Sequence, residues 1–150
     1  MKQSNQLNRR EFLAAAVAAA NIPYFIPSTV LAAPGRTGAN ERLTMAHIGV
    51  GGRGKGLFRE LEKFRQTGAV KVAAVCDVDE NRLADAAKEA GPGVDVYRDY
   101  RYILERRDID AVVIGTPDHW HGVQMVHAAE CGKHMYLEKP ACCTIEEGQA

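Results

Sequence analysis

The sequence predicts an α/β fold in which helices cover a doubly wound parallel sheet. Short apolar segments alternate with segments of helical periodicity from residue 43 onward, and this alternation is typical of strands joined by crossover helices. The apolar segments are rich in β-branched residues, as in strands that are buried on both faces. The chain has 150 residues, of which 46% are hydrophobic and 25% charged, which is enough for one globular domain.

Five segments are predicted as strands, and the connections between them as helices. The strands are residues 43–50, 70–76, 94–97, 111–115 and 134–137. In the first three connections, apolar side chains recur at the spacing of one helical face; they are Leu57, Phe58, Leu61 and Phe64, then Leu83, Ala86, Ala87 and Ala90, then Tyr100, Ile103 and Leu104. A fourth helix is expected at 121–131, ending at Gly132. Thr144 and Glu147 match a capping box, which predicts a further helix near Ile145.

Residues 1–32 have the layout of an export signal. Arg9 and Arg10 precede an Ala-rich apolar run that ends at Ala20, and small residues follow at 30–33. A basic segment, an apolar segment and a cleavage-like site together predict a signal peptide, and the paired arginines resemble the twin-arginine type. We expect cleavage after Ala32 and a periplasmic or secreted protein.

A membrane anchor is the alternative interpretation of this segment. Asn21, Pro23, Pro27 and Ser28 interrupt the apolar stretch well short of the roughly 20 residues that a spanning helix needs. We therefore expect no stable membrane insertion after cleavage. Residues 33–42 are rich in Gly and polar side chains and indicate a linker, which leads into one domain at 43–150.

Charge and cysteine content argue against two further classes of site. The chain has 19 Lys and Arg against 19 Asp and Glu, and no basic patch indicates a nucleic-acid partner. Its cysteines lack the C-x-x-C spacing of zinc and redox sites, and His119 and His121 have no accompanying ligand set. We expect buried thiols, no thiol nucleophile and no metal site. The cysteines are Cys76, Cys131, Cys142 and Cys143.

A glycine-rich turn follows the first predicted strand. Gly49, Gly51 and Gly54 match G-x-G-x-x-G between an apolar strand and an amphipathic helix, which is the phosphate-binding turn of the Rossmann fold. The first glycine permits the tight turn, the second lets a pyrophosphate approach the backbone, and the third lets helix and strand pack closely. We predict a dinucleotide site here that includes the neighbouring Gly52 and Arg53.

Asp77 ends the second predicted strand, a little over 20 residues after Gly54. A carboxylate at this point accepts hydrogen bonds from the adenosine ribose hydroxyls and repels a 2′-phosphate, which favours NAD over NADP. NADP stays open because Arg53 and Arg82 are candidates for a phosphate. Alternatively, Asp77 caps the following helix, although Asp79 is equally placed for that role.

Two later motifs carry a family resemblance. Thr116-Pro117-Asp118 begins a loop after the fourth strand, with His121 three residues on, and Glu138-Lys139-Pro140 follows the fifth. With the glycine turn, this order of motifs resembles the N-terminal domain of the glucose-fructose oxidoreductase, inositol dehydrogenase and rhizopine-catabolism oxidoreductases (Gfo/Idh/MocA) over residues 43–150. One departure is Asp118, where an Asn commonly follows Thr-Pro in that family.

The resemblance assigns roles to these motifs. It implies that Thr116, Pro117, His121, Glu138 and Lys139 border the cofactor, and that Lys139 also reaches the substrate hydroxyl as a catalytic residue. A hydride leaves a carbon more easily as its hydroxyl loses a proton, and a cation near that oxygen stabilises the negative charge that then develops. The resemblance also implies a cis peptide bond before Pro140. Trp120 is expected beside the cofactor rings or a neighbouring domain, and His127 is expected to be structural.

The resemblance further implies an oxidoreductase that transfers a hydride between NAD(P) and a sugar, polyol or related hydroxyl compound. Members of that family continue with an α+β domain that carries the general acid/base, and we expect this domain to be absent from the 150 residues. An uncovered apolar surface then predicts self-association into a homo-oligomer. Two alternatives stay open: an NAD-dependent glycosidase of the same family and a non-catalytic dinucleotide-binding module.

Overall fold

The computed structural model describes residues 31, 33 and 37–149. The predicted signal peptide lies almost entirely outside the described residues, as does the start of the predicted linker. A short 3-10 turn, η1 (Ala39–Glu41), precedes the sheet. No helix in the described part of the chain is long and apolar enough to cross a membrane.

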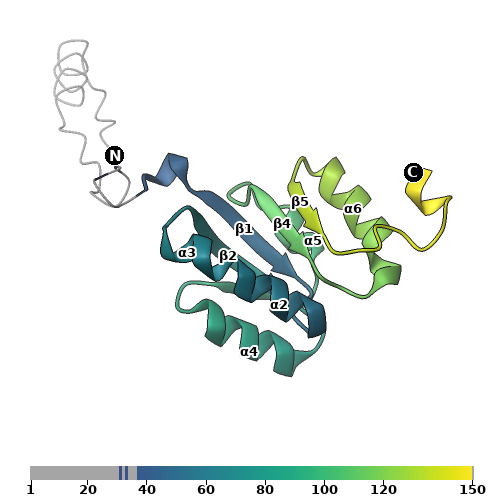
Figure 1. The fold of residues 1–150 in the computed structure, drawn as a ribbon, viewed down its shortest axis with the longest axis horizontal. Helices are drawn as coiled ribbons and strands as arrows, with labels where there is room; N and C mark the ends of the chain where they lie inside the picture. Colours follow the sequence, from purple (N-terminus) through teal and green to yellow (C-terminus); the bar gives the residue numbers. More distant parts are fainter. Residues whose placement is uncertain (1–30, 32, 34–36, 150) are drawn as a thin grey trace, which may run out of the picture.

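The core is a parallel sheet of five strands in the order β3-β2-β1-β4-β5 (Figure 1). The strands are β1 (Leu43–Ile48), β2 (Val70–Cys76), β3 (Asp95–Tyr97), β4 (Ala111–Ile114) and β5 (His134–Leu137). Every adjacent pair is parallel. The strand order reverses between β1 and β4, and ligands of such sheets bind at the carboxyl ends of the strands at this point.

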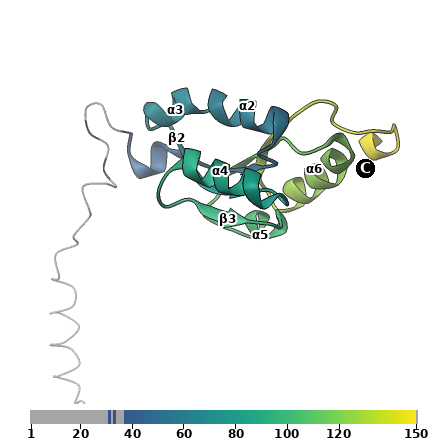
Figure 2. The same cartoon turned by 90° about the horizontal axis from the view of Figure 1, so that it is seen from below.

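Helices cover both faces of the sheet, as predicted (Figure 2). They are α2 (Gly52–Glu60), α3 (Glu62–Gln66), α4 (Glu80–Ala90), α5 (Arg101–Leu104) and α6 (His121–Glu130). Phe58 of α2 and Leu83 of α4 pack with Val75 of β2 in one cluster. Ile103 of α5 and Ala128 of α6 pack with Ile48 of β1 in another. The two clusters are the two hydrophobic layers of a doubly wound fold.

Three predictions about burial and helix ends were wrong. Strands β3 and β5 are only partly buried, because they lie at the edges of the sheet. The first predicted helical face is divided at Leu61, whose N–H is shared between the carbonyls of Leu57 and Arg59. The helical periodicity does not continue past this point, so Phe64 is exposed.

The C-terminal capping bond forms, but no α-helix follows it. The Glu147 N–H donates to Thr144 Oγ1 at 3.2 Å, and the chain then forms a 3-10 turn, η3 (Glu147–Gln149). The prediction of buried thiols is confirmed for Cys76 alone. Cys131 and Cys143 are exposed because they lie in the turns after α6 and β5 rather than in a strand.

Candidate functional site

A groove of about 750 Å³ runs across the carboxyl ends of the strands. It lies at the reversal of strand order between β1 and β4, the position where the fold class binds its ligands. Seven of the predicted site residues line it: Gly49, Gly51, Gly52, Arg53, Asp77, Thr116 and Pro117. Gly54, His121, Glu138 and Lys139 do not line it, and their positions are described below.

Three glycines pack against one another beneath the groove. Gly49 has a φ of +81°, which L side chains rarely adopt. A Cβ on Gly54 would lie 1.9 Å from the Gly49 carbonyl oxygen, and a Cβ on Gly115 would lie 2.7 Å from the Gly54 Cα. This is the close packing of helix and strand predicted for Gly54, and Gly115 is an additional requirement for it that the motif did not indicate.

The N-terminus of α2 faces the groove through Gly51 and Gly52. Gly51 is the N-cap residue of this nine-residue helix, and free N–H groups at a helix N-terminus attract anions. The atoms nearest to a Cβ on Gly51 would belong to the flexible side chain of Arg82, with Nη1 at 2.6 Å. The missing side chain therefore leaves room for a pyrophosphate to approach the backbone, so the turn fits a dinucleotide.

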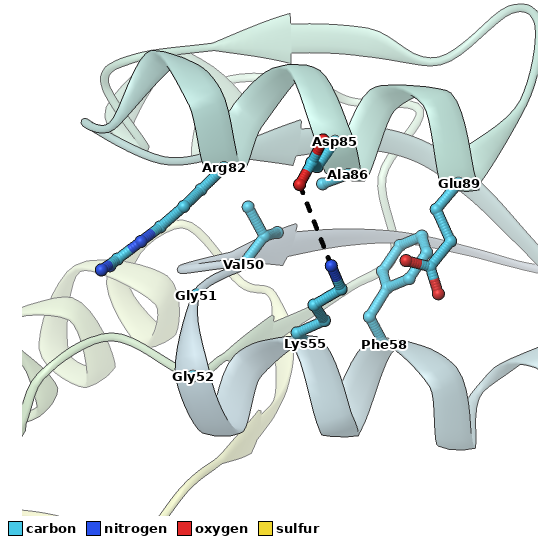
Figure 3. A pocket seen from close by; sticks show the side chains of 9 residues that line it. All are labelled: Val50, Gly51, Gly52, Lys55, Phe58, Arg82, Asp85, Ala86 and Glu89. Carbon is cyan, nitrogen blue, oxygen red and sulfur yellow. Dashed lines mark ion pairs between the residues drawn. The ribbon is translucent and has the colours of Figure 1, made fainter.

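A smaller cavity of about 110 Å³ lies between α2 and α4, beside the glycine turn (Figure 3). Lys55 of α2 points across it toward Asp85 of α4, with Nζ and Oδ2 4.0 Å apart. Arg82 lines both this cavity and the main groove. The small cavity is thus bounded by an ion pair and by an arginine that also faces the dinucleotide groove.

Asp77 is held by two backbone donors at the end of β2. Its Oδ2 accepts from the Val50 N–H at 2.9 Å, and its Oδ1 accepts from the Asp79 N–H at 3.0 Å. Asp79 is the residue that caps α4, because its side chain accepts from the Asn81 and Arg82 N–H groups. Asp77 is therefore free of the capping role, and its carboxylate is oriented at the groove wall before any ligand binds.

Three arginines near Asp77 each have a carboxylate partner. Arg82 pairs with Asp79 at 3.6 Å and Arg98 pairs with Glu80 at 3.0 Å. Arg101 pairs with Asp99, and its hydrogen bonds lower the pKa of that carboxyl. Because these cations are already neutralised by nearby acids, the adenosine end carries little net positive charge for a 2′-phosphate, which agrees with NAD as the cofactor.

The other end of the groove is organised by side chains of the Thr-Pro loop and of the segment after β5. Thr116 Oγ1 donates to Gln124 Oε1 of α6 at 2.7 Å. Arg53 Nε donates to Glu138 Oε2 at 3.1 Å, and this bond lowers the pKa of Glu138 and raises that of Arg53. The ion pair joins the first turn of α2 to the end of β5.

Lys139 is exposed next to this ion pair. Within the described residues its ammonium forms no ion pair or side-chain hydrogen bond. The peptide bond between Lys139 and Pro140 is cis, as the family resemblance implied. The Lys139 side chain is thus exposed and without an ion-pair partner among the described residues.

The structure assigns His121 to the protein interior rather than to direct contact with a cofactor. Its side chain is fully buried, and its ring nitrogens lie 2.6 Å from the Pro140 oxygen and 2.8 Å from the Thr116 oxygen. His121 does not line the groove itself, because packing beneath the loop places it behind Thr116, which does.

Several groove residues were not predicted as site residues. The Tyr100 hydroxyl and His127 Nδ1 form a hydrogen bond of 2.8 Å. The Tyr100 ring also makes an edge contact with the Trp120 ring, with 6.4 Å between the ring centroids. Burial raises the pKa of Tyr100. His127, which was expected to be structural, also lines the groove. The groove residues without a predicted place in the site are Ile48, Cys76, Val78, Arg98, Asp99, Tyr100, Arg101, Gly115, Val123, Gln124 and His127; Arg82 and Trp120, which were expected near the cofactor, also line it.

The position of Tyr100 in the sequence could have indicated that it lines the groove. Tyr100 follows the third strand, and the carboxyl ends of all parallel strands meet at the same edge of the sheet. Its helical spacing with Ile103 instead led to its assignment to the buried face of a helix.

Among the described residues, no group of three or more His, Cys, Asp or Glu side chains is arranged to hold a metal ion.

Comparison with known proteins gives a family match over the whole predicted domain. The model of an oxidoreductase family with an NAD-binding Rossmann fold, Gfo/Idh/MocA, matches residues 43–150. The myo-inositol dehydrogenase of Lactobacillus casei, solved with NAD(H) and myo-inositol, superposes with a TM-score of 0.66 and 26% identity. The superposition covers 72% of this chain and 31% of that one.

Curated relatives carry glycosidase names. A glycosyl hydrolase family 109 protein of Shewanella sp. (strain W3-18-1) is 33% identical over 95% of this chain and 36% of its own length. An α-N-acetylgalactosaminidase of Shewanella oneidensis is 36% identical over 71% of this chain and 24% of its own length. The chain thus spans about a third or less of the length of these proteins.

Proposed function

The chain belongs to the Gfo/Idh/MocA oxidoreductase family and contains its NAD-binding Rossmann domain, and from this membership we propose that it is the cofactor half of an exported enzyme. That enzyme transfers a hydride between NAD and a sugar, polyol or related hydroxyl compound. The observation that carries the proposal is the groove, which has a glycine turn and Asp77 at one end and an unpaired lysine beside the other.

The described residues fit a dinucleotide in one orientation. The glycine turn and the N-terminus of α2 receive the pyrophosphate, and Asp77 accepts from the adenosine ribose hydroxyls. The nicotinamide half then extends toward Thr116 and Pro117, which line the groove. When bound, the nicotinamide accepts or donates the hydride.

Lys139 is the chemical group that this chain contributes to the reacting centre. A hydride leaves a carbon more easily as the hydroxyl on that carbon loses its proton to a base, and the Lys139 ammonium stabilises the negative charge that this proton loss develops on the oxygen. Glu138 directly precedes Lys139 in the chain, and its 3.1 Å ion pair with Arg53 holds it in position. Glu138 is therefore a positioning residue for Lys139.

An NAD-dependent glycosidase is the second candidate, and the curated relatives favour it. Their names include glycosyl hydrolase family 109 protein and α-N-acetylgalactosaminidase. Glycosidases that use NAD are exceptions to the usual mechanism with two carboxylates. In such an enzyme the cofactor returns to its starting state, whereas a dehydrogenase forms NADH in stoichiometric amount.

Export is proposed from the leader. The paired Arg9 and Arg10, the Ala-rich run and the small residues at 30–33 support a twin-arginine signal cleaved after Ala32. Sequencing the N-terminus of the protein from the periplasm or medium tests this, with Ala33 as the expected first residue. Intact Met1 on exported protein would contradict it.

Two assays on one longer protein, continued to the length of the relatives, separate the candidates. Incubation with NAD and a panel of sugars and polyols should form NADH, and Lys139→Ala should lower this rate by about a hundredfold. Hydrolysis of a chromogenic α-N-acetylgalactosaminide without net NADH would favour the glycosidase instead. Neither reaction, in a protein that binds NADH, would leave the non-catalytic binding module. The 150 residues alone should bind NADH without turnover, because orientation of the substrate carbon and transfer of its hydroxyl proton need groups opposite the nicotinamide, which the family resemblance assigns to another domain.

A further inference from the structure

His121 occupies an unusual position for a titratable side chain. The ring begins α6, has an exposed fraction of 0%, and lies between two backbone carbonyl groups. Nδ1 is 2.6 Å from the Pro140 oxygen, and Nε2 is 2.8 Å from the Thr116 oxygen. Both distances are those of hydrogen bonds.

Both partners of the ring are acceptors. A neutral imidazole carries one N–H and one lone pair, so it can donate to one of the two carbonyls only. At the other carbonyl, a nitrogen lone pair would face an oxygen lone pair at hydrogen-bond distance, which is unfavourable. An imidazolium carries an N–H on each nitrogen and satisfies both carbonyls at once.

The two carbonyls belong to separate segments of the site. Thr116 belongs to the loop after β4 that lines the groove, and Pro140 directly follows Lys139. We propose that His121 is a positioning residue which, as an imidazolium, ties the Thr116 loop to the Lys139 segment and so fixes the nicotinamide end of the groove. The functional part of this inference rests on the proposed function; the hydrogen bonding does not.

The charged groups on the surrounding elements do not replace the carbonyls as partners. Asp118 lies in the preceding 3-10 turn η2 (Asp118–Trp120), Glu147 of η3 lies beside Gly122, and His127 of the same helix binds Tyr100. Glu138 is paired with Arg53, and Lys139 is exposed. Among the described residues, no carboxylate lies within ion-pair distance of the His121 ring.

The state of the ring can be measured directly on the 150-residue chain without any cofactor. Nitrogen-15 NMR of the histidine side chains, with His121→Gln used to assign the signal, distinguishes protonated from unprotonated ring nitrogens. Because both ring nitrogens face carbonyl oxygens, we expect both His121 nitrogens to carry protons in the folded chain at neutral pH. One protonated nitrogen and one lone pair at that pH would overturn the proposal, whether or not the chain binds NADH.

Ligand affinity tests the positioning role. We expect His121→Gln to weaken NADH binding about tenfold, the value of one hydrogen bond from a charged donor, and to leave AMP binding unchanged. We also expect wild-type NADH affinity to fall as the pH is raised through the deprotonation seen by NMR, with no such fall in His121→Gln. The matched control is His134→Gln, an exposed histidine on β5, which should behave as wild type.

Two results would contradict the positioning role. Equal losses of AMP and NADH affinity in His121→Gln would mean that the ring supports the fold in general. NADH affinity that does not change with pH in the wild type would mean that the proton on His121 does not control the site. If the variant does not fold, the ring signals of His121 are assigned by through-bond correlation to its own backbone, and the NMR measurement and the pH dependence of the wild type still decide the proposal.

Discussion

The two ends of the groove are built in different ways. At the adenosine end, backbone groups fix the site: the Val50 and Asp79 N–H groups hold Asp77, and glycines pack beneath the turn. At the nicotinamide end, side chains from distant segments hold one another, as in the Arg53–Glu138 pair across 85 residues. The first end is therefore held by backbone packing and by hydrogen bonds from backbone N–H groups, whereas the second depends on contacts between side chains that single substitutions can remove.

Substitution of Gly54 should have the largest effect, because it attacks the backbone packing of the first end. In Gly54→Ala the new Cβ would lie 1.9 Å from the Gly49 carbonyl oxygen, so helix α2 and strand β1 must separate. We expect the free energy of unfolding to fall by about 4 kcal/mol or more, measured by urea denaturation.

Gly56→Ala on the same helix is the matched control. A Cβ there would meet Arg53 Nη1 at 3.5 Å, an ordinary contact, and Ala is a better helix former than Gly by about 1 kcal/mol. We expect this variant to be slightly more stable than wild type. Similar losses in both variants would mean that the three-glycine contact is not what limits substitution.

His47 should give the next largest effect, as a pH dependence of stability beneath the glycine turn. The ring is buried against Phe58, neither ring nitrogen has a hydrogen-bond partner, and burial lowers the pKa from 6.5 to about 4. Between these values the unfolded chain binds a proton that the folded chain does not, so stability present above pH 6.5 is lost as the pH falls.

The expected loss from His47 is about 3 kcal/mol between pH 7 and pH 4. Denaturation at both pH values should show that His47→Leu has a smaller acid loss than wild type by about that amount. His134→Gln serves as the control, because that ring is exposed and should leave the acid loss unchanged. Identical pH dependence in wild type and His47→Leu would contradict the assignment.

Asp77→Ala should weaken NADH binding by about tenfold to a hundredfold, because the variant loses the charged acceptor for hydrogen bonds that the ribose hydroxyls donate. The preference for NADH over NADPH should narrow, since repulsion of the 2′-phosphate is relieved. Asp79→Ala is the control: it should lower stability by about 1 kcal/mol through loss of the helix cap and leave both affinities unchanged. Calorimetric titration distinguishes these results, and unchanged NADH affinity in Asp77→Ala would refute the assignment.

Disruption of the Arg53–Glu138 pair should have the smallest effect. Arg53 is half exposed, and such pairs contribute little, so we expect Glu138→Gln to weaken NADH binding by about threefold. A double-mutant cycle with Arg53→Gln should show that the two changes are coupled. Fully additive losses would mean that the ion pair does not organise this end of the groove.

The difference between the two ends also explains what the sequence could predict. The glycine turn and Asp77 lie within one strand-helix-strand unit, where spacing along the chain determines spacing in the fold. The strands and the parallel sheet follow from local periodicity in the same way. The role of Gly115 and the pairing of the arginines depend on contacts between different helices and strands, which no local sequence pattern predicts.

His121 shows the limit most clearly. A family resemblance placed it at the cofactor, but its burial and its two carbonyl partners depend on the fold of the segment after β5. Phe64 fails for a related reason, since helix α2 ends before Leu61 and Phe64 lies in the separate short helix α3. Strands β3 and β5 were predicted as buried because the amino-acid composition of a strand does not indicate whether it lies at the edge of the sheet.

Backbone amide shifts in the 150-residue chain test the central claim most directly when AMP and nicotinamide mononucleotide are added separately. The account predicts that AMP moves the signals of Val50, Gly51 and Asp77, whereas nicotinamide mononucleotide moves those of Thr116 and Glu138. Titration of both in the same sample should move both sets. Shifts of one common set by the two ligands, or AMP shifts confined to Thr116 and Glu138, would contradict a dinucleotide that lies with its adenosine on Asp77.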